Sequence, residues 1–193
     1  MSSVFRHNWL GPVAWITAAY VVLTVITFEL LLPLQDKAAG DYANYASVIF
    51  LPHGLRVVVA WLWRWRSVPM MVPAIMLEHA FLYGGTEISL AHAAVSLGSI
   101  LCAPAAFDLL ALAGLDLRRQ TGRRVHWHDL ILVAALAAAI NSAVTAALYG
   151  NDLLTTSAWF VGDLAGAASV MVGLKLWFAI GRRRRQRRTL ADR

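Results

Sequence analysis

The sequence predicts an all-α membrane protein, a polytopic bundle of about six transmembrane helices with its N- and C-termini in the cytoplasm. Of the 193 residues, 59% are hydrophobic and 15% are charged, whereas in soluble domains about 25% are charged and less than about half are apolar. The apolar residues form runs that reach or approach the roughly 20 residues needed to cross a bilayer. The composition therefore excludes a water-soluble globule.

Six apolar segments are expected to be the transmembrane helices. In order along the chain they are 12–34, 46–63, 67–84, 88–115, 129–149 and 157–180. Strands are excluded because the open edge of a sheet has no hydrogen-bond partners in hydrocarbon. The first segment is longer than the roughly 7 to 15 apolar residues of a signal peptide, so we expect it to remain as a helix. Residues 1–180 are thus expected to form one transmembrane domain, followed by a basic cytoplasmic tail at 181–193.

Basic residues gather at alternate ends of these segments and set the expected orientation. One set of flanks carries Arg6, Arg64, Arg66, Arg118, Arg119, Arg123, Arg124 and, in the tail, Arg182, Arg183, Arg184, Arg185, Arg187, Arg188 and Arg193. The opposite flanks carry Lys37 and the acidic residues Asp36, Asp41, Glu87 and Asp152. Because positively charged loops are retained in the cytoplasm, both termini are expected there. This placement favours contact of the tail with anionic lipid and not with nucleic acid.

Ten polar residues within the predicted helices are the strongest indication of a site. They are Glu29, His53, Arg56, Glu78, His79, His92, Asp108, Asn141, Asp163 and Lys175. An ionisable group at the centre of a membrane helix costs roughly 2.5 to 3.5 kcal/mol, so such groups face the bundle interior and pair. We therefore expect these side chains to turn toward one another.

Seven of the ten are expected to line a ligand pocket that opens to the outside. They are His53, Arg56, Glu78, His79, His92, Asn141 and Asp163. Counted at about 1.5 Å per residue from the outer helix ends, they lie at similar depths of about 6 to 15 Å. Arg56 would bind an anionic group, with Asp163 or Glu78 as its counter-charge, and the histidines would supply switchable donors. The alternative is a set of charge pairs that only fixes the register of the helices.

The other three residues are expected to lie apart from this pocket. Glu29 is closest to the outer surface and is expected to be peripheral. Asp108 and Lys175 lie about 5 to 10 Å from the cytoplasmic side, where we expect them to pair as an inner gate or as a plain clamp. The alternative for Lys175 is to reach the lipid headgroups.

Small residues and prolines indicate how the helices pack. Gly162, Gly166, Ser169 and Gly173 form one stripe on the last predicted helix. Such a stripe is typical of close helix contact, either within one chain or in a homodimer, and both remain open. Pro52 is expected to bend or break the second helix, which is tolerated where the freed carbonyls line a cavity.

Motifs of catalysis and cofactor binding are missing. HExxH, GxSxG and GxxxxGK[ST] do not occur, so we expect no enzyme activity and no cofactor. The histidines of the predicted pocket come from three helices, and we expect no metal site there. His126 and His128 flank Trp127 and are expected at the membrane surface. The single cysteine, Cys102, excludes an intrachain disulfide.

Two segments point to a known family. One is Leu51-Pro52-His53-Gly54 with the apolar run that leads to Trp61-Leu62-Trp63-Arg64-Trp65-Arg66, and the other is Trp159-Phe160-Val161-Gly162-Asp163-Leu164-Ala165-Gly166. Together they resemble the first class of membrane-associated sensor (MASE) domains, over residues 46–180. That family is an integral-membrane sensory module of bacterial signalling proteins, typically placed before a histidine kinase, diguanylate cyclase or phosphodiesterase domain.

The chain departs from that family in three ways. His53 and Arg56 occupy the first motif, the family usually has more spans, and we expect no output domain after the last helix. The resemblance therefore implies a sensor-like module of the bacterial inner membrane that binds a small polar or anionic ligand and signals through a separate partner. Two alternatives stay open, namely a small-molecule transport component, as a substrate-binding subunit or transporter, and a structural membrane protein without a ligand.

Overall fold

The computed structural model describes residues 9–39, 47–84, 89–119 and 125–191, with side chains up to residue 182. Every regular element within these ranges is helical. The elements are α1 (Leu10–Val25), the π-helix η1 (Ile26–Leu31), α2 (Leu32–Ala39), α3 (Leu51–Trp63), the 3-10 helix η3 (Arg64–Arg66), α4 (Ser67–Tyr83), α5 (Leu90–Leu112), α6 (Trp127–Tyr149) and α7 (Leu153–Ala191). Some charges used to predict the orientation lie outside the described residues, namely Arg6, Asp41, Glu87, Arg123, Arg124 and Arg193.

The prediction of six transmembrane helices is wrong. Four helical stretches in the described residues are long and apolar enough to cross a membrane, and they are Leu10–Lys37, Leu90–Leu112, Trp127–Tyr149 and Leu153–Arg182. The predicted segments 46–63 and 67–84 contain α3 and α4, which have only 13 and 17 residues. Their lengths of about 20 Å and about 26 Å fall short of the roughly 30 Å of a bilayer core. The assignment of both termini to the cytoplasm stays a prediction, because an even number of crossings, four as well as six, leaves both ends of a chain on the same side of the membrane.

Helix α3 is short because both of its ends are fixed by local chemistry. Pro52 lies in its first turn, where a proline has no N–H to leave unpaired, so this residue begins the helix and does not bend it as predicted. At the other end Arg64 has a φ of 53°, which turns the chain sharply toward α4. Arg64 is the only non-glycine residue with positive φ among those described.

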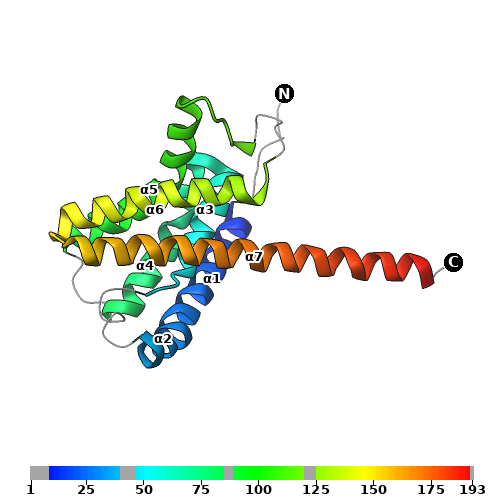
Figure 1. Ribbon diagram of the computed structural model, residues 1–193, viewed down its shortest axis with the longest axis horizontal. Coiled ribbons are helices and arrows are strands. Elements are labelled where there is room, and N and C mark those ends of the chain that lie inside the picture. Colours follow the sequence, from blue (N-terminus) through cyan, green and yellow to red (C-terminus); the bar gives the residue numbers. More distant parts are fainter. Residues whose placement is uncertain (1–8, 40–46, 85–88, 120–124, 192–193) are drawn as a thin grey trace.

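Helix α3 lies at the centre of the bundle and packs against α1, α4, α5, α6 and α7. Val57 belongs to an apolar core shared with α5, α6 and α7, whereas Val59 belongs to a second core shared with α1, α4 and α5. Figure 1 shows α5, α6 and α7 running together, with α1, α2 and α4 beneath them in that view. Protein therefore surrounds the side chains of α3, and His53 and Arg56 are both buried.

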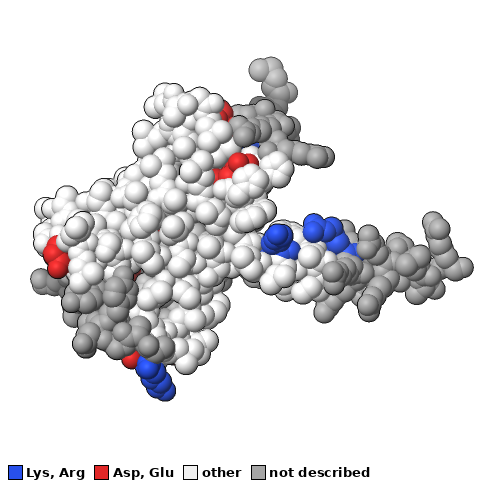
Figure 2. All heavy atoms as spheres, viewed as in Figure 1, with Lys and Arg blue, Asp and Glu red and all other residues white. Residues whose placement is uncertain are grey.

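The outer faces of the bundle are apolar, as a lipid environment requires. Large side chains such as Trp15, Leu90 and Leu112 are almost fully exposed. Figure 2 shows few charged side chains over the bundle, while blue side chains appear on the part of α7 that projects beyond it. Helix α7 continues without interruption past Gly181 to Ala191, so the predicted basic tail begins as the end of a helix.

Two glycines of α7 hold the segment that leads into α3. A Cβ atom at Gly162 would collide with the Ser47 carbonyl oxygen, and one at Gly166 with the Phe50 carbonyl oxygen. The Phe50 N–H also donates to the Gly162 carbonyl at 2.9 Å. The predicted small-residue stripe thus packs inside the chain at these two glycines and not at Gly173, where an added Cβ atom would have no described atom within 4 Å.

The same segment is held from the other side by the first membrane helix. The Leu51 N–H donates to Thr27 Oγ1 of η1 at 3.3 Å, and the Val48 N–H donates to Gln35 Oε1 of α2 at 2.5 Å. A π-helix is rare and often marks a functional position. Residues 47–51 are therefore clamped between α7 and η1, which fixes the start of α3 and the side chains that follow it.

Candidate functional site

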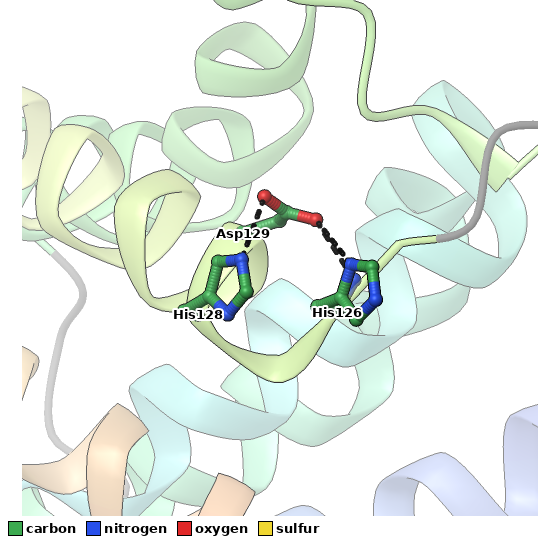
Figure 3. Close-up of side chains that lie close together, drawn as sticks. All are labelled: His126, His128 and Asp129. Atoms are coloured by element: carbon green, nitrogen blue, oxygen red, sulfur yellow. Dashed lines mark hydrogen bonds and ion pairs between the residues drawn. The ribbon is translucent and has the colours of Figure 1, made fainter.

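Imidazole and carboxylate groups gather at the start of α6 (Figure 3). His126 Nδ1 lies 3.7 Å from Asp129 Oδ2, and His128 Nε2 lies 3.6 Å from Asp129 Oδ1. Among the described residues this is the one group of three whose ligand atoms lie close enough to share a metal ion. Asp129 also caps α6 by accepting the His126 N–H at 2.8 Å, which accounts for the position of its carboxylate without a metal.

A pocket of about 240 Å³ lies at the other end of the bundle. Its walls come from η1, the segment before α3, and helices α3 to α7. It is lined by Phe28, Ser47, Phe50, Arg56, Ile75, Glu78, His79, Leu82, Tyr83, His92, Val95, Ser96, Ser99, Asn141, Tyr149, Trp159 and Asp163. We call this part of the bundle the pocket half, and the part that holds Arg64, Asp108 and Arg118 the arginine half.

The structure places six of the seven predicted pocket residues on the wall of this pocket. They are Arg56, Glu78, His79, His92, Asn141 and Asp163. His53 is the exception, because it is completely buried behind the wall and reaches the pocket only through Asp163. Glu29, which was expected to be peripheral, is exposed and does not line the pocket.

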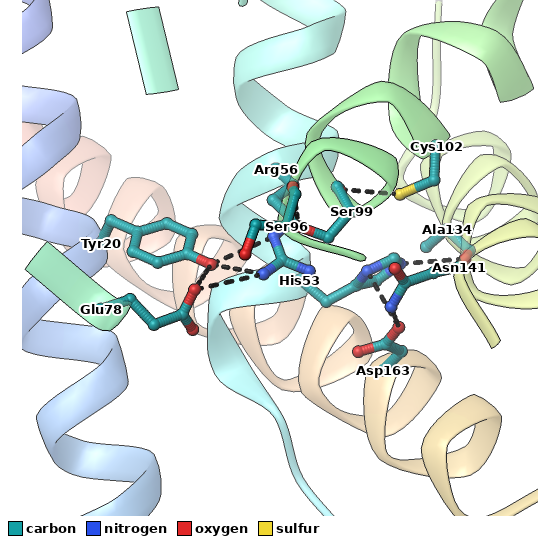
Figure 4. A network of polar contacts seen from close by, with 10 residues as sticks. All are labelled: Tyr20, His53, Arg56, Glu78, Ser96, Ser99, Cys102, Ala134, Asn141 and Asp163. Carbon is teal, nitrogen blue, oxygen red and sulfur yellow. Dashed lines mark hydrogen bonds and ion pairs between the residues drawn. The ribbon is translucent and has the colours of Figure 1, made fainter. Parts of the chain in front are cut away.

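Arg56 forms a buried cluster with Glu78 and Tyr20 (Figure 4). Arg56 Nη2 lies 3.7 Å from Glu78 Oε2. Arg56 Nε and Nη2 donate to the Tyr20 hydroxyl at 3.1 and 2.5 Å, and that hydroxyl donates to Glu78 Oε2 at 2.9 Å. The guanidinium also lies 5.3 Å from the centre of the Phe50 ring. Of the two acids predicted as the counter-charge of Arg56, Glu78 is therefore the one in contact with it, and Asp163 is not.

Asp163 instead forms a second cluster with Asn141 and His53. Asn141 Nδ2 donates to Asp163 Oδ2 at 2.7 Å, and His53 Nδ1 lies 3.4 Å from the same oxygen. His53 Nε2 lies 3.2 Å from the Ala134 carbonyl oxygen, and since a carbonyl only accepts, Nε2 carries a hydrogen. His53 Nδ1 makes no hydrogen bond to a described residue, so its approach to Asp163 is a close contact between polar groups and not a bond.

Four rings form the polar rim of the pocket. The His79 and Tyr83 ring centres are 4.7 Å apart, those of Tyr83 and His92 are 4.8 Å apart, and those of His92 and Tyr149 are 5.8 Å apart. Ser89 holds His92 in place, because its Oγ accepts the His92 N–H at 3.1 Å and caps α5. His79 Nε2 is fully enclosed and has no hydrogen-bond partner among the described residues, so it faces protein and not the open space of the pocket.

The arginine half does not contain the predicted pair of Asp108 and Lys175. Asp108 accepts hydrogen bonds from Arg64 Nη2 at 3.1 Å and from Trp65 Nε1 at 2.6 Å. Lys175 is exposed, and its Nζ lies 5.1 Å from the centre of the Trp127 ring. The prediction failed because two arginines of neighbouring turns, Arg64 and Arg118, lie closer to the acid.

A second acid of the arginine half lies in the loop after α5. Arg118 Nε donates to Asp116 Oδ1 at 2.7 Å, and its Nη2 contacts the other carboxylate oxygen. This hydrogen bonding lowers the pKa of the Asp116 carboxyl below its usual value. These groups are accessible to water, and they hold the loop and not a ligand.

Tyr20 is the main residue of the site that the sequence prediction missed. Its hydroxyl joins Arg56 to Glu78 although the residue lies in an apolar run. A signal for it is present, because Tyr20, Thr24 and Thr27 share one helix face with Ile16 at spacings of four, four and three, and all four are buried.

Comparison of the chain with protein-family models, with curated proteins and with solved structures found no match. The geometry of the pocket is accordingly the main guide to the function of the chain.

Proposed function

We propose that this chain is a multi-pass protein of a bacterial inner membrane that acts as a sensor-like module. It binds a small polar ligand in the pocket and signals through a separate partner. The observation that carries the proposal is the pocket itself, which places Arg56, Glu78 and Asp163 on the wall of one cavity among apolar helices. Charge pairs that only fix the register of the helices do not need a cavity beside them, whereas a ligand site does.

The resemblance to membrane-associated sensor domains supports the sensory part of the proposal. In the segment Trp159–Gly166 of α7, Gly162 and Gly166 hold the chain before α3. Trp159 and Asp163, from the same motif, line the pocket. One short motif thus supplies both the support and part of the wall, which is what a motif tied to ligand binding is expected to do.

A transport component is the second candidate, and one observation favours it. The first membrane helix changes to the π-helix η1 at Ile26–Leu31, and Phe28 of this segment lines the pocket. Interrupted helices beside a polar site are common in transporters. Uptake of a labelled ligand that needs a co-expressed ATPase or an ion gradient would favour transport, whereas binding without uptake and a co-purifying kinase or cyclase would favour sensing.

A screen of small polar metabolites by thermal shift on the detergent-purified full chain tests the binding function. The pair Ser96→Phe and Leu97→Phe gives a matched control, because Ser96 lines the pocket and Leu97 is 52% exposed on the outside of the same helix. We expect at least one compound to raise the melting temperature of the wild type and of Leu97→Phe but not of Ser96→Phe. A library without any stabilising compound, or an equal shift in Ser96→Phe, would contradict the proposal.

A further inference from the structure

The two charged clusters of the pocket each leave one atom without a partner among the described residues. Arg56 uses Nε and Nη2 to contact Tyr20 and Glu78, and its Nη1 donates to none of the described residues. Asp163 uses Oδ2 to contact Asn141 and His53, and its Oδ1 accepts from none of them. Neither Nη1 nor Oδ1 is among the fully enclosed polar atoms that lack a hydrogen bond. Since both residues line the pocket, each atom is reached through it.

These two atoms are held in place by contacts on their far sides. The Arg56 guanidinium lies over the Phe50 ring and is anchored by the Tyr20 hydroxyl. The Asp163 carboxylate is anchored at Oδ2 by Asn141, and His53 is fixed behind it by its bond to the Ala134 carbonyl. Arg56 and Asp163 are themselves more than nine-tenths buried. A ligand would therefore meet a preformed donor and a preformed acceptor, which lowers the entropy that binding must overcome.

The rest of the pocket lining suits a small ligand that carries an ammonium group. Phe28, Phe50 and Trp159 present aromatic rings to the pocket, and aromatic faces attract ammonium groups. The volume of about 240 Å³ is smaller than the roughly 300 to 1,000 Å³ of sites for larger organic ligands. The pocket therefore suits a compound of amino-acid size.

We infer that the pocket recognises a small zwitterion, of the class of amino acids and betaines. The acid group of the ligand binds Arg56 Nη1, and its ammonium group binds Asp163 Oδ1. A ligand with one charge would displace water from the pocket and leave the other open atom without a partner, which is costly for a charged group. This inference rests on the proposed function, because it names the ligand class of the same pocket.

The experiment compares charge classes at constant size by isothermal titration on the detergent-purified full chain. The probes are the common α-amino acids, β-alanine, γ-aminobutyrate and glycine betaine. For each compound that binds, the amide or ester removes the acid group, and the desamino acid removes the ammonium group. We expect both single-charge analogues to bind at least about tenfold more weakly than the parent zwitterion.

Asp163→Asn and Asp108→Asn make a matched pair for the same titration. Both changes remove a carboxylate charge, but Asp108 is in the arginine half and does not line the pocket. Asp163→Asn should weaken the zwitterion about tenfold or more and leave its desamino acid unchanged, whereas Asp108→Asn should change neither. If Asp163→Asn does not fold, the test rests on the wild-type protein alone, through the affinities of the zwitterion and of its single-charge analogues.

The outcomes separate this inference from the function on which it rests. Binding of a single-charge analogue as tightly as its parent zwitterion would overturn the inference and leave a ligand pocket. Binding of neutral compounds from the metabolite screen alone, with no zwitterion in the series bound, would do the same. The absence of binding by any compound, charged or neutral, would overturn both the inference and the proposed function.

Discussion

The two halves of the bundle hold similar charged groups in different ways. In the pocket half, Arg56 and Asp163 are 4% and 3% exposed, and their partners come from other helices. In the arginine half, the side chains of Arg64 and Asp108 are 33% and 32% exposed, and a turn next to α3 supplies the partners. Charges in contact with water fix a loop at little cost, whereas buried charges are retained only where several helices enclose them. The pocket half is therefore the part of the chain whose charged groups point to a binding function.

The largest expected difference between the halves is the cost of removing an arginine. Arg56→Ala leaves Glu78, whose side chain is only 12% exposed, without its counter-charge, so we expect a loss of up to about 3 to 5 kcal/mol in the free energy of unfolding. Arg64→Ala breaks a pair that is one-third exposed and should cost less than about 1 kcal/mol. Denaturation by SDS in mixed micelles measures both values. Equal costs for the two changes would remove the distinction between the halves.

The glycines of α7 give the next largest effect. Gly166→Ala places a methyl group against the backbone of Phe50, and because the backbone cannot move aside, we expect a loss of about 1 to 3 kcal/mol or more. Gly173→Ala meets open space on the same helix and should leave stability unchanged or raise it by about 0.5 to 1 kcal/mol. The same SDS titration measures both variants, and a neutral Gly166→Ala would show that α7 does not hold the start of α3.

A double-mutant cycle resolves the charge pairing inside the pocket half. The structure pairs Arg56 with Glu78 and not with Asp163. Alanine substitutions of Arg56 and Glu78, singly and together, should give a coupling energy of about 0.5 to 3 kcal/mol, and the cycle for Arg56 and Asp163 should give a smaller one. A larger coupling in the second cycle would restore Asp163 as the counter-charge and contradict the observed contacts.

The smallest expected effect is in the arginine half and depends on pH. The hydrogen bond from Arg118 lowers the folded-state pKa of Asp116, so the stability it contributes is present above the ordinary aspartate value of about 3.9. That contribution is lost as the pH falls through the lowered pKa. In Arg118→Gln the Asp116 carboxyl should titrate at a higher pH, as followed by NMR of carboxyl-labelled aspartate. Asp152, whose pKa is lowered by hydrogen bonds from Thr155, should not change. An unchanged Asp116 titration would argue against Arg118 as the cause.

The grouping of the polar residues was accessible from the sequence, but the partners of each residue were not. Counting residues from the helix ends gives a depth, and similar depths were enough to bring Arg56, Glu78 and Asp163 to one pocket. Which acid meets the arginine depends on how each helix is rotated about its axis, and that rotation is set by packing. Tyr20 was missed for the same reason, since a tyrosine in an apolar run is ordinary until its neighbours are known.

The number of crossings could not be predicted from hydropathy. A helix enclosed by other helices is as apolar as a helix in contact with lipid, so its hydropathy does not show which of the two surrounds it. Residues of α3 such as Val57 and Ala60 are apolar because they lie inside the bundle, against α5 and α6. The length of α3 therefore does not have to match the thickness of a bilayer, and the helix ends where Arg64 turns the chain. The predicted segment 46–63 has 18 mostly apolar residues and indicated a crossing, although only 13 residues are helical.

Thiol labelling at two neighbouring positions is the decisive test of whether the polar side chains enclose a cavity open to water. Ser96→Cys places a thiol in the pocket, Leu97→Cys places one on the outer face of the same helix, and the native Cys102 is buried. A charged methanethiosulfonate reacts with the thiolate, which forms in water and not in lipid. Applied to intact cells and to inverted vesicles, the reagent should label Ser96→Cys from one side of the membrane and leave Leu97→Cys and the wild type unlabelled. Labelling of Leu97→Cys as fast as Ser96→Cys, or protection of Ser96→Cys from both sides, would contradict a water-filled pocket.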